Sequence, residues 1–285
     1  MRMTTLLPLR TVAFADGTTV PAMGLGTWRM GETRPDAARE VAALVRGLDL
    51  GMTLIDTAEM YGDGGAEEIV AKALQGRRDD AFIVSKVYPH NAGAKSAPAA
   101  CERSLKRLRT DRIDLYLLHW PGSIPLAETV EAFERLREAG KIVRWGVSNF
   151  DIRAMRALEA TKSGGHCATN QVLYNLCERG PEFDLLPWCA GQHMPVMAYS
   201  PVNQGALAKH RKLAALAAAN GVTAAQLALA WTMRDPLVIT IPKSSTLARV
   251  DENRRAAALV LTPDVTGQLD VLFPPPRGAA PLTML

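Results

Sequence analysis

Short apolar runs alternate with longer stretches in which apolar residues recur every three or four positions. Runs of three to six apolar residues are typical of buried parallel strands, and we expect strands at residues 23–26, 53–55, 82–86, 115–119, 143–148, 169–171, 196–199 and 238–241. The longer stretches predict amphipathic helices at residues 35–50, 66–74, 97–108, 126–139, 151–159, 185–190, 213–220, 223–233 and 263–272.

The two ends of the chain carry turn and breaker signals. Asp16-Gly17 lies between alternating residues of the segment 10–21, which is the strongest short-range indication of a β-hairpin. Near the other end, three consecutive prolines, Pro274 to Pro276, cannot continue a helix. We therefore expect residues 274–285 to form an extended tail.

Strands that alternate with helices predict parallel pairing through right-handed crossovers. The 285 residues show no break in composition and suit a barrel of about 250 residues. We expect one domain over residues 1–285, an α/β fold of the (β/α)8 TIM-barrel type with the N-terminal hairpin closing its bottom. The alternative is an open doubly wound sheet. It predicts a three-glycine fingerprint after the first strand, and the segment after Gly24 and Gly26 lacks the third glycine.

Composition excludes several classes of partner. The net charge is only +4, and basic residues are interleaved with acidic ones, which argues against nucleic-acid binding. The four cysteines form no Cys-x-x-Cys pair, and the five histidines lack metal-ligand spacing, so we expect free thiols and no metal. The apolar run in the first ten residues is too short for a signal peptide, and no segment approaches the roughly 20 apolar residues that span a bilayer. These features predict a cytoplasmic protein without a membrane partner.

Four residues with proton-transfer chemistry lie where predicted strands end. Asp56, Lys86 and His119 end the second, third and fourth strands, and Tyr61 follows five residues after Asp56. In a barrel, the carboxyl ends of the strands meet on one face and carry the active site. We therefore expect these side chains to converge.

Each of the four could take part in chemistry at a carbonyl group. A tyrosine has a pKa of about 10, and a nearby ammonium from Lys86 is expected to lower it, so that Tyr61 can donate a proton. Asp56 would keep Lys86 charged, and His119 would supply a second hydrogen bond to the same oxygen. Because this set contains no source of electrons, a hydride-carrying cofactor is the missing part.

Motifs along the chain resemble those of the aldo-keto reductases. The matching segments are Gly51-x4-Asp56-Thr57-Ala58-x2-Tyr61-Gly62, Lys86, Leu118-His119-Trp120-Pro121, Gly146-Val147-Ser148-Asn149-Phe150, Asn170-Gln171, Ala198-Tyr199-Ser200-Pro201 and Ile241-Pro242-Lys243-Ser244. The resemblance implies a (β/α)8 barrel that reduces aldehydes and ketones with NADPH and has no separate nucleotide-binding domain. It also implies a monomer, with Tyr61 as the acid, Asp56 and Lys86 tuning it, and His119 orienting the carbonyl.

The resemblance also implies a set of cofactor contacts. These are Thr27, Ser148, Asn149, Gln171, Tyr199, Ser200, Lys243, Ser244, Arg249, Glu252 and Asn253. Tyr199 should stack on the nicotinamide ring. Lys243, Ser244 and Arg249 follow the eighth strand at the start of a short helix, where barrels commonly hold phosphate, and they favour the 2′-phosphate of NADPH.

Two tryptophans and two short segments bear on the substrate. Trp28 and Trp120 follow the first and fourth strands and should line the pocket. The loop after the fourth strand and the tail are short, which predicts an open mouth and broad specificity. Arg277, Thr283 and Met284 are weaker candidates for substrate contacts. The runs 56–68 and 167–174 resemble a bacterial branch associated with methylglyoxal reduction.

Two other functions stay open at this point. Some barrels of this family serve as cofactor-sensing subunits of other proteins, with little turnover of their own. A metal-dependent hydrolase is the second alternative, although its strands should present pairs of histidines. A turnover assay distinguishes the first alternative from an enzyme, and metal analysis tests the second.

Overall fold

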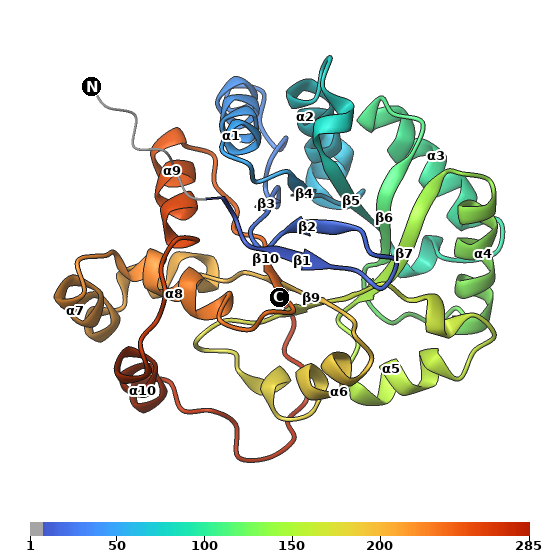
Figure 1. Cartoon of the computed structure of the whole chain (residues 1–285). Coiled ribbons are helices and arrows are strands. Elements are labelled where there is room, and N and C mark those ends of the chain that lie inside the picture. Colours follow the sequence, from blue (N-terminus) through green and yellow to red (C-terminus); the bar gives the residue numbers. More distant parts are fainter. Residues whose placement is uncertain (1–7) are drawn as a thin grey trace.

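The computed structural model describes residues 8–285, so most of the N-terminal segment considered for a signal peptide, residues 1–7, lies outside the described range. Eight strands form one sheet in the order β10-β9-β8-β7-β6-β5-β4-β3, and every pairing in it is parallel (Figure 1). The strands are β3 (Leu25–Gly26), β4 (Leu54–Asp56), β5 (Phe82–Val87), β6 (Ile113–Leu118), β7 (Ile142–Ser148), β8 (Asn170–Leu173), β9 (Val196–Tyr199) and β10 (Val238–Thr240). Each predicted strand is present, within two residues at either end.

The first and last strands of this sheet also meet. Parallel bridges join Met23 to Thr240 and Gly26 to Lys243. Gly24 N donates to Thr240 O at 2.9 Å, and Gly26 N donates to Pro242 O at 3.1 Å. These bonds close the sheet into a barrel, which confirms the predicted fold class over an open doubly wound sheet.

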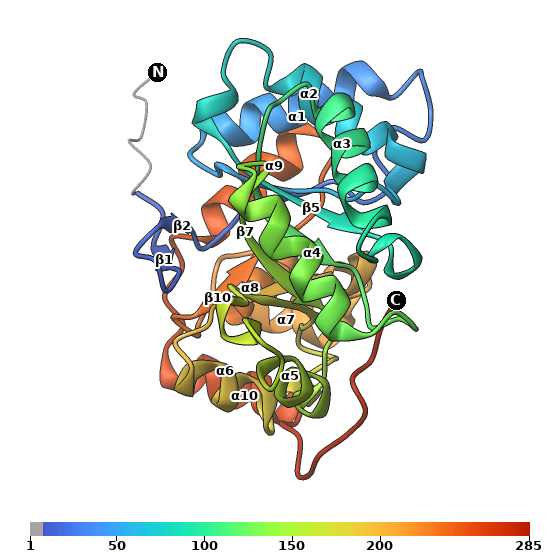
Figure 2. The same cartoon turned by 90° about the vertical axis from the view of Figure 1, so that its right-hand side faces the viewer.

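Helices alternate with the strands and surround the barrel (Figures 1 and 2). They are α1 (Ala37–Asp49), α2 (Gly65–Ala73), α3 (Ser96–Leu108), α4 (Leu126–Glu138), α5 (Ile152–Glu159), α6 (Leu185–Gly191), α7 (Arg211–Ala219), α8 (Ala224–Thr232), α9 (Leu247–Ala256) and α10 (Pro263–Leu272). The predicted helices agree with these bounds to within two residues. The sequence indicated only the start of α9, because its weakly amphipathic, charged run lacks a clear apolar face.

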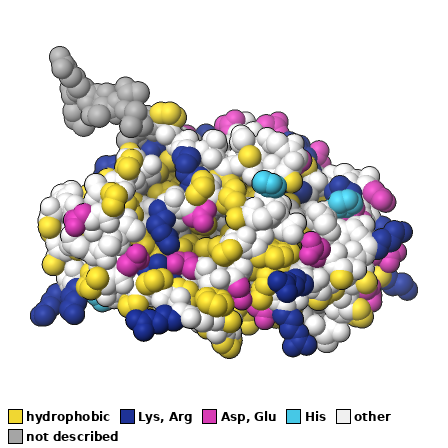
Figure 3. All heavy atoms as spheres, turned by 60° about the horizontal axis from the view of Figure 1, so that its bottom comes forward, with side chains coloured by type: hydrophobic (Ala, Val, Ile, Leu, Met, Phe, Trp, Pro, Cys, Tyr) yellow, Lys and Arg dark blue, Asp and Glu magenta, His cyan; other side chains and the backbone are white. Residues whose placement is uncertain are grey.

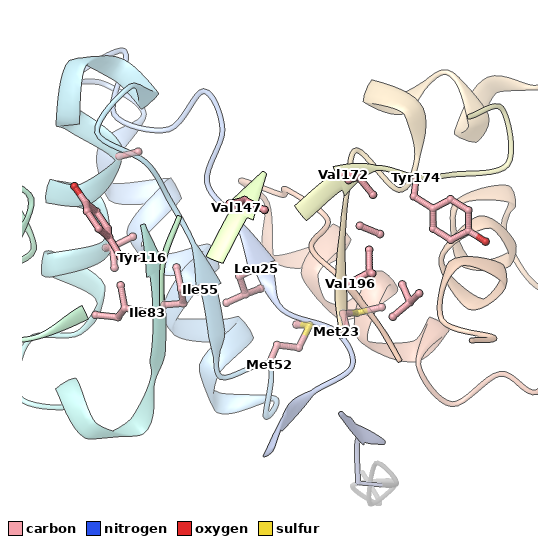
Figure 4. Packing of buried hydrophobic residues seen from close by; sticks show 14 of the residues in the cluster. Met23, Leu25, Met52, Ile55, Ile83, Tyr116, Val147, Val172, Tyr174 and Val196 are labelled. Atoms are coloured by element: carbon pink, nitrogen blue, oxygen red, sulfur yellow. The ribbon is translucent and has the colours of Figure 1, made fainter. Parts of the chain in front are cut away.

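Alternation along each strand divides the core into two clusters. Ile55, Ile83, Tyr116, Val147 and Val196 point outward and pack against the helices (Figure 4). Their neighbours in sequence form the inner cluster, with Leu54, Val84, Leu115, Leu117, Met197 and Ile239 as members. Side chains alternate between the two faces of a strand, and here both faces are buried. The apolar runs in the sequence are therefore continuous rather than alternating.

The N-terminal hairpin covers the end of the barrel at which the strands begin, against the apolar inner cluster. Strands β1 (Thr11–Ala13) and β2 (Thr19–Pro21) pair antiparallel, with Val12 opposite Val20. Val12, Phe14 and Val20 belong to the inner cluster, and the Phe14 and Phe82 rings stack at 5.5 Å. Burial of these side chains against the barrel interior closes its bottom, as predicted.

The surface and the tail add two further observations. On the face shown in Figure 3, basic and acidic side chains lie interspersed. Residues 274–285 form an extended tail without helix or strand, as predicted, and it returns to the barrel (Figure 2). Within residues 8–285, no single helix is long and apolar enough to cross a membrane, and α7 with α8 meets that test only as a pair bent by 87°.

Candidate active site

The alternation of the strands also points the candidate polar side chains into the barrel. Asp56 lies two residues beyond the inward-facing Leu54, and Lys86 lies two residues beyond Val84. His119 follows Leu117 by the same step, immediately after β6. Since two residues make one full repeat of a strand, these polar groups stand above the apolar inner cluster, at the carboxyl end of the barrel.

The structure brings Asp56, Lys86 and Tyr61 into direct contact. Lys86 Nζ lies 2.8 Å from Asp56 Oδ2, 2.9 Å from Thr57 O and 3.1 Å from Tyr61 Oη. Lys86 is fully buried and Asp56 is 3% exposed, while the Tyr61 side chain is only partly buried. An ammonium ion that is held by a carboxylate is therefore placed against a phenol that faces the cavity.

Tight backbone geometry fixes the turn that carries Tyr61. The residue begins a short 3-10 turn, Tyr61–Gly64, in which Gly62 and Asp63 adopt positive φ angles of 57° and 52°. A side chain on Gly65 would approach Gly31 O to 2.5 Å, so the start of α2 packs backbone against backbone on the loop after β3. The glycines thus allow an approach that any larger residue would prevent.

The electrostatics of this cluster correct one expectation. Burial raises the pKa of Tyr61, and the Lys86 ammonium lowers it only in part, so the net direction is upward rather than the predicted decrease. Burial also lowers the pKa of Lys86, but Asp56 and then Tyr61 more than offset this, and the net pKa is raised. Both groups therefore hold their protons at neutral pH, and Tyr61 is present as a potential proton donor.

His119 lies beside this cluster as a neutral imidazole. Its ring is 5.8 Å from the Tyr61 ring, in an edge-on arrangement. Burial first, and the Lys86 charge second, lower the pKa of His119 to about 2. Its Nδ1 atom has no hydrogen-bond partner within residues 8–285. A neutral ring with one N–H group can donate a hydrogen bond to a substrate oxygen.

Hydroxyl and amide groups line the next part of the barrel rim. Tyr199 Oη donates to Asn149 Oδ1 at 2.9 Å, and Asn149 Nδ2 donates to His119 O and Ser148 Oγ, both at 3.1 Å. Ser148 Oγ donates to Gln171 O at 2.9 Å. Gln171 lies on β8 with its side chain in the barrel, where Nε2 donates to Asp56 Oδ1 at 2.7 Å. These bonds hold the four side chains beside Asp56, Lys86 and Tyr61.

One cavity of about 960 Å³ joins these groups to the phosphate-type residues. Its walls include most of the predicted site residues, namely Trp28, Asp56, Tyr61, His119, Trp120, Ser148, Asn149, Gln171, Tyr199, Ser200, Lys243, Ser244, Arg249, Glu252 and Asn253. Lys86 and Thr27 lie behind the wall. Thr27 is fully buried, and its hydroxyl donates to Asp56 O at 2.9 Å; its contact with the cofactor stays a prediction.

The far end of the cavity is basic and exposed. Lys243 and Arg249 are exposed, and Ser244 lies between β10 and the start of α9. Thr246 precedes α9 without a side-chain capping bond, which leaves the first N–H groups of the helix available to an anion. Glu252 accepts a 2.6 Å bond from Thr223 Oγ1 at the start of α8.

Several residues of the cavity wall were not predicted. They lie on the loop after β9 and on the tail, and include Val202, Gln204, Gly205, Ala208, Lys209 and Leu285. Of the weaker candidates on the tail, Met284 lines the cavity, whereas Arg277 and Thr283 are not among the lining residues. The barrel rule that places sites on the loops after each strand was a usable signal for the loop after β9.

In the part of the chain that the structure describes, the acidic, thiol and imidazole side chains do not gather into a ligand set. Within residues 8–285, no group of three or more His, Cys, Asp or Glu side chains could hold a metal ion. The buried cation beside Tyr61 is Lys86, which pairs with Asp56.

Comparison with known proteins identifies the family. The family model described as "Aldo/keto reductase family" matches residues 22–273. The chain belongs to the aldo/keto reductase family. Over 279 residues, 50% are identical to methylglyoxal reductase YeaE of Escherichia coli, which covers 96% of this chain and 98% of the relative. Glyoxal reductase of Bacillus subtilis is 33% identical, over 92% of each chain.

Solved structures of aldo/keto reductases share this fold closely. An aldo/keto reductase from Klebsiella pneumoniae, in complex with NADP and acetate, superposes with a TM-score of 0.95 and 52% sequence identity. The match covers 97% of this chain and 100% of that chain. The resemblance inferred from sequence motifs is thereby confirmed at the level of family and fold.

Proposed function

We propose that this chain reduces small aldehydes and ketones to alcohols with NADPH, and that Tyr61 donates the proton. The observation that carries the proposal is the contact of Lys86 Nζ with both Asp56 Oδ2 and Tyr61 Oη at the wall of the cavity. A buried cation next to a phenol stabilises the phenolate that forms as the proton leaves. Family membership and the NADP-bound relative support the cofactor assignment.

The residues of the cavity fit a nicotinamide nucleotide. Ser148, Asn149 and Gln171 offer amide and hydroxyl groups beside the aromatic ring of Tyr199, which suits a carboxamide on a flat ring. Lys243 and Arg249 offer positive charge at the other end for phosphate groups. When bound, NADPH supplies the hydride that reduces the carbonyl carbon.

The chain's own residues would manage the carbonyl oxygen. Tyr61 donates its proton to that oxygen as negative charge develops there. Lys86 stabilises the resulting phenolate, and Asp56 keeps Lys86 protonated and in place. His119 remains neutral, so it orients the oxygen by a hydrogen bond and leaves proton donation to Tyr61.

Small reactive aldehydes such as methylglyoxal are the proposed substrates. The relatives named for methylglyoxal and glyoxal reduction support this class. Trp28 and Trp120 provide aromatic walls, and Met284 and Leu285 of the tail also line the cavity. We therefore expect compact carbonyl compounds to react faster than bulky ones.

A steady-state rate panel tests the function. Methylglyoxal, an aryl aldehyde, a ketone and an aldose are each supplied with NADPH and, in parallel, with NADH. We expect oxidation of NADPH that depends on the carbonyl compound, fastest with the small aldehydes. Tight nucleotide binding without turnover of any carbonyl would instead favour the cofactor-sensing alternative.

A further inference from the structure

One hydrogen bond in the barrel interior joins the nicotinamide end of the cavity to the proton-donor end. Gln171 Nε2 donates to Asp56 Oδ1 at 2.7 Å, between residues that are 115 positions apart in sequence. Lys86 Nζ occupies the other carboxylate oxygen, Asp56 Oδ2, at 2.8 Å. Each oxygen of this buried carboxylate therefore has its own donor.

We propose that Gln171 is a positioning residue for the proton donor. It holds the Asp56 carboxylate in the orientation in which that carboxylate fixes Lys86 against Tyr61. This inference rests on the proposed reductase function and goes beyond it, because the resemblance assigns Gln171 only to the cofactor.

The chemistry of the two groups fixes how Gln171 points. An ionised carboxylate can only accept hydrogen bonds, so the NH2 group of Gln171 must face Asp56. The other neighbour of Nε2 is Met197 Sδ at 3.8 Å, and a thioether is a weak acceptor. The Gln171 backbone is itself fixed, because its carbonyl accepts from Asn149 N at 2.8 Å and from Ser148 Oγ at 2.9 Å.

Loss of this donor should disturb the proton donor directly. Asp56 is 3% exposed, so water cannot readily replace the lost hydrogen bond. A carboxylate free to rotate would no longer hold Lys86 Nζ at 3.1 Å from Tyr61 Oη. A displacement of about 1 Å in an active site can reduce the rate by about 100-fold.

The first arm of the test compares Gln171→Leu with Met197→Leu. Both variants remove the contact between Gln171 Nε2 and Met197 Sδ, but only Gln171→Leu also removes the hydrogen bond to Asp56. We expect Gln171→Leu to lower kcat at saturating NADPH by about 10- to 100-fold, whereas Met197→Leu keeps kcat near that of the wild type. Denaturant unfolding checks that both variants fold, and Gln171→Met replaces the leucine variant if it does not.

The second arm uses Gln171→Glu, which has nearly the shape of glutamine. Its carboxyl group can donate to Asp56 only while it is protonated, and the adjacent carboxylate should raise its pKa above the usual value of about 4.3. The ratio of kcat for the glutamate variant to kcat for the leucine variant should therefore rise as the pH falls. Lys86 and Tyr61 lie beside Asp56, and His119 lies beside Tyr61, in both variants, so their own titration largely cancels in the ratio.

Nucleotide affinity separates the two roles of Gln171. Quenching of tryptophan fluorescence by NADPH measures the Kd of each variant without turnover. A Gln171→Leu variant with wild-type kcat and only a higher Kd would show a cofactor contact and nothing more. A kcat ratio that does not change with pH would show a packing role, and either result overturns the inference. If the wild type turns over no carbonyl, the reductase proposal itself has failed, and the positioning role fails with it.

Discussion

The two ends of the cavity treat charge in opposite ways. At the proton-donor end, the Lys86 and Asp56 side chains are 0% and 4% exposed and pair at 2.8 Å. At the phosphate end, Lys243 and Arg249 are exposed, and the structure records no ion pair for either side chain within residues 8–285. A buried charge needs an oppositely charged partner in the protein, whereas an exposed cation is solvated and remains available to bind an anionic ligand.

This difference predicts where a substitution is felt. The proton-donor end is complete within the protein, so changes there should affect both stability and catalysis. In the proposed function, the phosphate end is completed only by the nucleotide, so changes there should affect nucleotide affinity alone. Substitutions at the two ends of the cavity test this difference.

Lys86→Met should have the largest effect on stability. It leaves the buried carboxylate of Asp56 without its cation, which costs about 3–5 kcal/mol in comparable buried pairs. Denaturant unfolding measures the loss. The matched control is Lys86→Met combined with Asp56→Asn, which removes both charges and should recover much of the loss. A double variant no more stable than the single one would contradict the importance of pairing.

Arg249→Ala should weaken NADPH binding without destabilising the fold. Loss of a charge-assisted bond to the 2′-phosphate costs about 1.5–3 kcal/mol, which corresponds to a roughly 10- to 100-fold increase in Kd. NADH lacks that phosphate and serves as the matched control, so its Kd should change little. Equal effects on the two nucleotides would remove the phosphate assignment of Arg249.

The neutral state of His119 predicts a dependence of stability on pH. Burial, and then Lys86, lower its pKa from 6.5 to about 2 in the folded state. Below a pH of about 6.5 the unfolded chain binds a proton that the folded chain excludes, so stability falls as the pH decreases, by up to about 1.4 kcal/mol per pH unit.

The test is unfolding between pH values of about 4 and 7 in the wild type and in His119→Gln. The variant should show the shallower decline, since glutamine cannot be protonated in this range. His90→Gln, a change at an exposed histidine, is the control and should keep the wild-type slope. A wild-type slope in His119→Gln would mean that other groups control the acid response.

Much of the site could be predicted because side chains two residues apart on a strand point to the same face. Asp56, Lys86 and His119 each follow an inward-facing apolar residue by two positions, so the barrel rule alone brought them to one rim. The Asp16-Gly17 turn likewise predicted the hairpin, although its register, with Val12 opposite Val20, was seen only in the structure.

The features that could not be predicted depend on how deeply side chains are buried and on the paths that the loops and the tail take. Thr27 has a suitable side chain at a suitable position, but whether it reaches the cavity depends on how deeply Trp28 and its loop pack. The direction of the Tyr61 pKa depends on a balance between burial and Lys86 that residue order does not reveal. The path by which the tail brings Met284 to the cavity is likewise a matter of tertiary packing.

The rate of hydride transfer in Tyr61→Phe shows whether Tyr61 is the proton donor. The variant keeps the ring and removes only the hydroxyl that lies 3.1 Å from Lys86 Nζ. Its single-turnover rate with methylglyoxal, and its Kd for NADPH, are compared with those of the wild type. We predict a rate lower by at least about 100-fold, because general acid catalysis contributes about 10²- to 10⁴-fold, with a nearly unchanged Kd. A variant that reduces methylglyoxal at the wild-type rate would contradict the assignment of Tyr61 as the proton donor.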